Sequence, residues 1–149
     1  MDESNRRPWF PMVVLLGAVY FLFGVAFAAL AGLSGSDAMR ATWNRLGFLA
    51  SAVAFAFHLG YEHFRLRDSA LITALHVSAA VALGAFALAL RVNVNGFRMG
   101  AGNQGLRAFA LVAWPAITAV PAFVVAIIAA ALLEKAYGKR KKKPDIADP

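Results

Sequence analysis

The chain has 149 residues, of which 60% are hydrophobic and 15% are charged, and its formal net charge at pH 7 is +7. A soluble domain carries about a quarter charged residues, so this composition excludes an ordinary soluble globular protein. The sequence contains no cysteine, which excludes disulfides, thiolate metal sites and cysteine nucleophiles.

Four apolar stretches without Asp, Glu, Lys or Arg occupy most of the chain, at 12–33, 46–61, 69–90 and 108–133. A helix of about 20 apolar residues crosses a hydrocarbon core of roughly 30 Å. The second stretch is too short to cross the bilayer, so we extend the predicted span to residue 42. This places Trp43 and Arg45 at the membrane–water interface. The sequence therefore predicts an all-α integral membrane bundle of four transmembrane helices in one domain, residues 1–138, with spans at about 12–33, 42–61, 69–90 and 108–133.

The positive charges predict an orientation and a lipid contact. Residues 139–149 form a basic tail that contains Lys139, Arg140, Lys141, Lys142 and Lys143. Such a cluster beside a span is attracted to anionic headgroups by about 1 kcal/mol per charge, so we expect a lipid partner and no nucleic acid. The connections on the side of the termini carry ten Lys and Arg, against five on the opposite side. The positive-inside rule then places both termini in the cytoplasm, as in a multi-pass protein of a bacterial inner membrane.

A cleavable signal peptide is the alternative interpretation of the first stretch. Arg6 and Arg7 precede it, and Ala29-Leu30-Ala31 resembles a signal-peptidase site. The apolar region of a signal peptide has about 7 to 15 residues, fewer than this stretch. We therefore expect the first span to be retained.

Small residues and prolines give the individual spans their character. Small residues recur every fourth residue and predict faces for close helix packing. These faces are Gly24, Ala28 and Gly32 in the first span, Ala52, Ala56 and Gly60 in the second, and Ala70, Ala74, Ser78 and Ala82 beside His76, Ala80 and Gly84 in the third. Pro115 and Pro121 predict a bend in the fourth span, with the Thr118 hydroxyl bonded to the carbonyl of Trp114.

The connections carry two local signals. Ser36 or Asp37 is expected to cap a short amphipathic turn ahead of the second span. Asn95-Gly96, between short alternating segments, indicates a β-hairpin in the connection that follows the third span.

Three ionisable side chains converge on the connection between the second and third spans. His58 precedes Glu62 by four residues, so both lie on one helix face. His76 enters the bilayer from the same side, and a connection of seven residues, 62–68, makes the two helices neighbours. Because ionisable groups inside a bilayer mark functional sites, we expect proton or substrate handling at His76, His58 and Glu62. His63 is expected at the surface, without a role.

Other interpretations of the histidines stay open. A neutral imidazole can instead be satisfied structurally by a hydroxyl such as Ser78, Thr73 or Tyr20, or by a carbonyl. Haem or a metal would use His58 and His76 as ligands, although no metal-binding spacing is present. No catalytic residue is predicted, and an enzyme is disfavoured.

Three functions follow from these observations. The first is an accessory or structural subunit of a membrane complex, or a small homo-oligomer held by the small-residue faces. The second is a small transporter or lipid-linked flippase that uses His76 and the proline-bent fourth helix. The third is a haem- or metal-binding redox subunit that uses His58 and His76.

Overall fold

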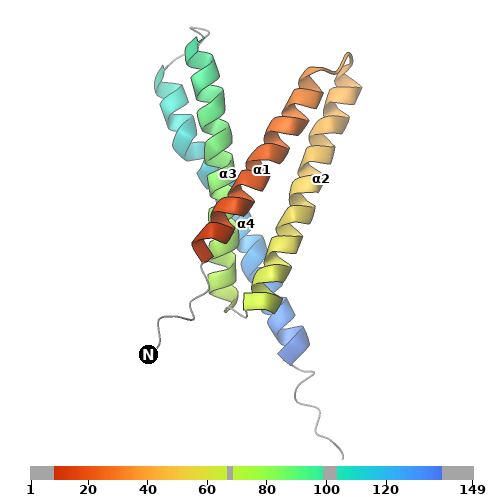
Figure 1. Cartoon of the computed structure of the whole chain (residues 1–149), viewed down its shortest axis with the longest axis vertical. Helices are drawn as coiled ribbons and strands as arrows, with labels where there is room; N and C mark the ends of the chain where they lie inside the picture. Colours follow the sequence, from red (N-terminus) through yellow and green to blue (C-terminus); the bar gives the residue numbers. More distant parts are fainter. Residues whose placement is uncertain (1–8, 67–68, 99–103, 139–149) are drawn as a thin grey trace, which may run out of the picture.

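The computed structural model describes residues 9–66, 69–98 and 104–138. Within them the chain forms four α-helices: α1 (Trp9–Gly32), α2 (Asp37–Tyr61), α3 (Ala70–Arg98) and α4 (Gln104–Gly138) (Figure 1). A short π-helical segment, η2 (Glu62–Leu66), continues α2. The all-α prediction is confirmed, whereas the basic cluster at 139–143 lies outside the described residues.

Three of the four predicted spans are confirmed as candidates for crossing a membrane. The helices that are long and apolar enough are α1, α3 and Gly105–Tyr137 of α4. Helix α2 has sufficient length, with 25 residues, but begins with a polar segment that includes Asp37, Arg40 and Arg45. It does not reach the same apolar content, so the second span stays a prediction.

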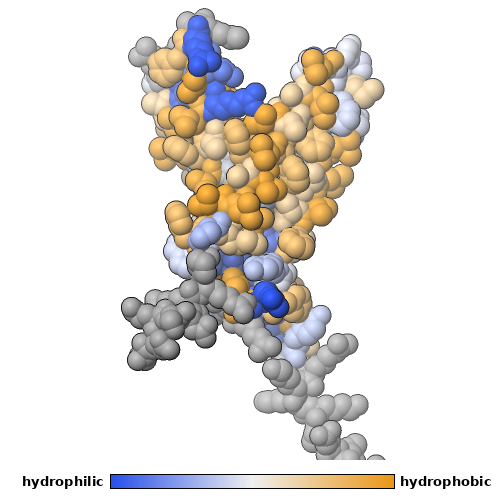
Figure 2. Space-filling view, viewed as in Figure 1, coloured by the Kyte–Doolittle hydropathy of each residue, from blue (hydrophilic) through white to orange (hydrophobic). Residues whose placement is uncertain are grey.

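The helices form two arms that diverge from a common base (Figure 1). Helices α1 and α2 pair in the first arm, and α3 and α4 pair in the second. Helix α1 begins and α4 ends at the base, and α1 also packs against α3. We call the opposite end, where α1 ends and the two arms stand apart, the open end. The space-filling view shows the same opening between the arms (Figure 2).

The contact between α2 and α3 is smaller than expected for two neighbouring helices joined by seven residues. Helix α2 packs mainly along α1, and α3 packs mainly along α4 and α1. Glycine explains why α1 lies close to α3, because a Cβ at Gly84 of α3 would lie 2.7 Å from the Tyr20 Cβ and 2.9 Å from the Gly17 carbonyl oxygen. Gly24 of α1 likewise lies against Leu88.

The predicted small-residue faces are therefore only partly used within the chain. Added Cβ atoms at Gly32 and Gly60 would meet nothing within 4 Å, and Ala52 and Ala56 are exposed. Two clusters of buried apolar side chains lie nearer the base and are formed by Val13, Leu16, Tyr20 and Ala80 and by Leu59, Ala74, Val77 and Ala126.

The helix ends confirm one local prediction and correct another. Ser36 acts as a cap, and its hydroxyl oxygen accepts the amide of Met39 at 3.2 Å. The element that it caps is α2 itself and not a separate short turn. The β-hairpin predicted at Asn95-Gly96 is wrong, because α3 continues as a helix to Arg98. The guanidinium of Arg107 packs against Gly96 and over the ring of Phe97, and these contacts stabilise the helical conformation over the local turn preference.

Helix α4 runs through both of its internal prolines, Pro115 and Pro121. The Thr118 hydroxyl lies 3.0 Å from the carbonyl oxygen of Trp114, which confirms that predicted hydrogen bond, and 3.0 Å from that of Pro115. The bend at the prolines stays a prediction.

Candidate functional site

The candidate site is built around Glu62, the first residue of η2. Its amide continues the hydrogen bonding of α2 by donating to the carbonyls of His58 and Leu59. The side chain is fully buried, with 0% of its surface exposed. His58, four residues earlier on the same helix face, is also fully buried. Burial of two adjacent ionisable groups is costly unless each has a partner.

A second histidine reaches Glu62 from the other arm. The Nδ1 atom of His76 in α3 lies 3.1 Å from Oε2 of Glu62, within hydrogen-bonding distance. The Nε2 atom of His58 lies 3.5 Å from Oε1, close enough for an ion pair, but the contact does not have the geometry of a hydrogen bond. The structure thus brings together the three residues predicted to form a cluster, with one carboxylate oxygen facing each imidazole.

One further side chain stacks on His76, and a buried hydroxyl lies three residues before it in α3. The indole of Trp9 in α1 stacks on the imidazole, with ring centroids 5.0 Å apart and planes 3° apart. Thr73 is buried in α3, and its hydroxyl has no hydrogen-bond partner. In the sequence, Trp9 is recognisable only as an aromatic residue just before the first predicted span, a position typical of a membrane interface.

Among the described residues, none of the three hydroxyls named in the structural interpretation bonds to an imidazole. Ser78 donates to the carbonyl of Leu75 at 3.1 Å, and the buried hydroxyls of Tyr20 and Thr73 make no hydrogen bond. The carboxylate of Glu62 is instead the group that faces both imidazoles.

The electrostatics of the cluster favour an ionised carboxylate. Glu62 follows the apolar part of α2 and lies outside the predicted span. Burial alone would raise the pKa of its carboxyl group, but the contacts and positive charge of His58 and His76 outweigh burial and lower this pKa below 4.5. With Glu62 ionised and each imidazole either neutral or protonated, the cluster carries a net charge between −1 and +1.

The other sequence candidates are His63 and the basic tail. His63 of η2 packs edge-on against Phe64, with ring centroids 5.0 Å apart, and its buried Nδ1 has no hydrogen-bond partner. The lipid-contact candidates Lys139, Arg140, Lys141, Lys142 and Lys143 lie outside the described residues.

The cluster does not fit the predicted metal or haem site. Among residues 9–66, 69–98 and 104–138, no group of three or more His, Cys, Asp or Glu has an arrangement that could hold a metal ion. A haem iron needs one imidazole nitrogen on each side at about 2 Å. Here the carboxylate of Glu62 faces both His58 and His76, so these histidines do not share an open position for iron.

The end of α4 also contributes to the base, which the sequence did not reveal. The carboxylate of Glu134 accepts the backbone amide of Ala70 at 3.0 Å, at the first residue of α3. The ring of Tyr137 packs edge-on against Phe64 of η2, with centroids 5.1 Å apart. Contacts from α2, α3 and α4 therefore surround the segment that carries Glu62, and Trp9 of α1 reaches its partner His76.

Comparisons with known proteins yield no match among protein-family models, curated proteins or solved structures. Chemically, the cluster can take up and release protons at the place where the arms meet. Protonating either imidazole strengthens its attraction to Glu62, and His76 reaches this carboxylate from the opposite arm. The protonation state can therefore change how firmly the arms are joined at the base.

Proposed function

We propose that this protein is a small proton-linked membrane transporter in which His58, Glu62 and His76 take up and release protons as the two arms move. The observation that carries the proposal is the fully buried Glu62, which faces a histidine from each arm. Replacing a buried ionic cluster by apolar side chains is often neutral or stabilising, so packing alone does not require one here. His58 and His76 lie within predicted spans, and ionisable groups at membrane depth are characteristic of proton relays and transport paths.

The shape of the bundle supports movement of the arms. The close crossing of α1 and α3 at Gly17 and Gly84 lies between the cluster and the open end, and it can act as a pivot. Strengthening the contact between Glu62 and His76 would then draw the base together, and weakening it would release the base. Many transporters alternate access by rocking one helical unit against another.

We also propose that α2 crosses the bilayer, which brings the number of spans to four, and that both termini lie in the cytoplasm. Helices α1 and α3 both start at the base (Figure 1). If both cross the bilayer, α2 has to bring the chain back over the same thickness. The excess of Lys and Arg on the side of the termini supports the cytoplasmic assignment.

Proton movement tests this function without knowledge of the solute. The protein is reconstituted in vesicles that contain the pH-sensitive dye pyranine, and an outward or inward pH gradient is imposed. Wild type is expected to dissipate the gradient faster than empty vesicles, and both E62Q and H76Q are expected to abolish the difference. The matched control is E134Q, which makes the same chemical change at the base but outside the cluster. A wild-type rate equal to that of empty vesicles, or one that E62Q leaves unchanged, contradicts the proposal.

Movement of the arms has its own readout. Because the chain has no cysteine, spin labels can be placed at exposed positions of the two arms through L33C and V92C. We expect the distance between the labels to change with pH, and the change to be lost in E62Q. A distance that does not depend on pH would remove the mechanical part of the proposal.

An exposed face of α2 supports a second candidate function, that of an accessory subunit or a small homo-oligomer. Val53 and Phe57 are 71% and 68% exposed, and the neighbouring small residues Ala52 and Ala56 are exposed as well. This face belongs to the most polar of the predicted spans and would pack closely against another helix. Native mass spectrometry after mild crosslinking is expected to detect a second copy or a partner. A monomer without partners counts against this candidate.

A further inference from the structure

Of the three side chains in the cluster at the base, only one is accessible from outside the protein. The side chains of His58 and Glu62 have no exposed surface, whereas 15% of the side chain of His76 is exposed. A fully buried carboxylate exchanges protons either through movement of the protein or through a partly exposed group in contact with it. His76 is such a group, because its Nδ1 atom lies 3.1 Å from Oε2 of Glu62. In this conformation, exchange with the cluster therefore passes through the imidazole of His76.

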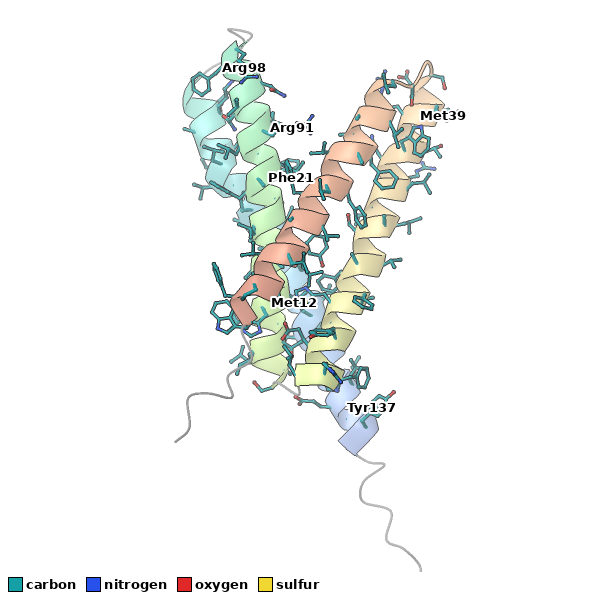
Figure 3. The ribbon with its side chains drawn as sticks, in the orientation of Figure 1. Met12, Phe21, Met39, Arg91, Arg98 and Tyr137 are labelled. Carbon is teal, nitrogen blue, oxygen red and sulfur yellow. The ribbon has the colours of Figure 1, made fainter. Side chains whose placement is uncertain are left out.

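This accessible imidazole is partly covered by Trp9. The indole lies parallel to the imidazole, with planes 3° apart and ring centroids 5.0 Å apart, so it closes one face of His76. Trp9 is the first residue of α1 and is itself 50% exposed. Figure 3 labels Met12, which belongs to the same end of α1, near the base. The indole therefore forms an outer cover on the one accessible member of the cluster.

Packing between α1 and α3 fixes the position of this cover. Both helices start at the base (Figure 1), and their contacts follow one another in register. Val13, one turn after Trp9, is buried in the same cluster as Ala80, which lies one turn after His76. The stacked rings are therefore the layer of this packed face that lies nearest the base, and the position of the indole depends on the placement of α1 as a whole.

The same register links the cover to movement of the arms. Trp9 belongs to the first arm and His76 to the second. Eight residues, or about 12 Å of helix, separate Trp9 from Gly17 at the crossing that can act as a pivot. A rotation of about 10° at this distance displaces the indole by about 2 Å, which is enough to take the two rings to the limit of about 7 Å for an aromatic contact. Rotation that weakens the contact between Glu62 and His76 would thus also uncover the imidazole.

We propose that Trp9 is the gate of the proton site, which covers His76 while the base is closed and uncovers it when the arms rotate. The gate regulates the same cluster and therefore rests on the proposed function. It assigns His76 as the residue at which protons enter and leave on the side of the base. Trp9 is a positioning residue, since its indole contacts the imidazole but has no acceptor nitrogen with which to take up a proton.

The accessibility of His76 tests the gate without a proton gradient. The full chain in detergent is treated with diethyl pyrocarbonate, which modifies the imidazoles that it can reach, and each histidine is followed by peptide mass spectrometry. We expect His76 to be modified about two- to tenfold faster in W9A than in wild type, the range that corresponds to the loss of one aromatic contact. Equal rates at His76 in the two proteins, or modification of His58 as fast as that of His76 in wild type, overturn the proposal.

Two further variants separate uncovering from a general change in structure. W9F keeps a ring over the imidazole and is expected to retain most of the protection. W114A makes the same substitution as W9A at a tryptophan of similar exposure, 54%, but in α4, and is expected to leave the rate at His76 unchanged. His63 is the internal reference and should react at one rate in all of these proteins. A rate at His76 that rises as much in W9F or W114A as in W9A would indicate loosening of the bundle and overturn the gate.

The vesicles that contain pyranine connect the gate to proton movement. If Trp9 limits exchange at His76, W9A dissipates the pH gradient faster than wild type, and W9A/H76Q loses this gain. Faster modification of His76 without faster dissipation in W9A would make Trp9 a cover without a gating role, which also overturns the proposal. A wild type that moves no protons contradicts the transport function, whereas the modification rates, measured without a gradient, still decide whether Trp9 controls access to His76.

Discussion

The indole of Trp9 lies flat against the imidazole of His76, with ring centroids 5.0 Å apart and planes 3° apart. The ring of Trp9 covers one face of the imidazole, while Nδ1 of His76 contacts Glu62 at 3.1 Å. A cation is attracted to the face of an indole. The imidazole of His76 is therefore held between an indole and a carboxylate.

The stacked pair predicts that Trp9 reports the charge of His76. An excited indole transfers an electron to an imidazolium in contact with it more readily than to a neutral imidazole. In a W43F/W114F background, which leaves Trp9 as the one tryptophan, we expect emission to fall on acidification. The H76Q version should lose this pH dependence. Identical emission profiles with and without His76 would mean that the two rings do not stack in the protein.

Glu62 predicts a pH dependence of stability with a defined sign. Its pKa in the folded protein is lowered below the ordinary value of 4.5 by His58 and His76, despite burial. A carboxyl group with a lowered folded-state pKa contributes stability that is complete above its unfolded pKa and is lost as the pH falls through the folded value. Thermal unfolding in detergent should therefore show a loss of stability below about pH 4.5 that is smaller in E62Q. An equal loss in wild type and E62Q would show that Glu62 is not held ionised by the histidines.

The sequence was informative about the cluster because its three members are linked by local rules. His58 and Glu62 share a face through helical spacing, and the short connection brings His76 close to both. Trp9 lies far away in the chain, and its contact with His76 depends on how α1 crosses α3. The small-residue faces were incomplete for the same reason. Gly84 lies on a predicted face of the third span, but its contact with Gly17 of α1 is a crossing that no single-helix pattern encodes.

The open end shows where local signals fail. Asn95-Gly96 has the preferred composition of a two-residue hairpin turn, yet α3 continues to Arg98. The glycine is used to admit the guanidinium of Arg107 from α4, an interaction between separate helices. A turn propensity is a small free-energy preference, so packing between helices overrides it.

The crossing of α1 and α3 predicts that Gly84 tolerates no side chain. A Cβ there would lie 2.7 Å from the Cβ of Tyr20 and 2.9 Å from the carbonyl oxygen of Gly17, a backbone atom. G84A is therefore expected to destabilise the bundle by about 1–3 kcal/mol, the usual cost of overpacking. The matched control is G60A, whose Cβ would meet nothing within 4 Å. Thermal unfolding measures both variants, and a G84A that is as stable as G60A would show that the helices do not cross this closely.

The carboxylate of Glu134 caps the beginning of α3 from the end of α4. It accepts the amide of Ala70 at 3.0 Å, one of the helix N-terminal amides without a partner in its own helix. Loss of a side-chain cap costs about 0.5–2 kcal/mol, so E134A should lower the free energy of unfolding within this range. E134Q should lose less, because the amide oxygen can still accept the hydrogen bond. K135A, at the next position, controls for a general effect of alanine at the end of α4. Equal stabilities of E134A and K135A would show that α3 does not depend on this cap.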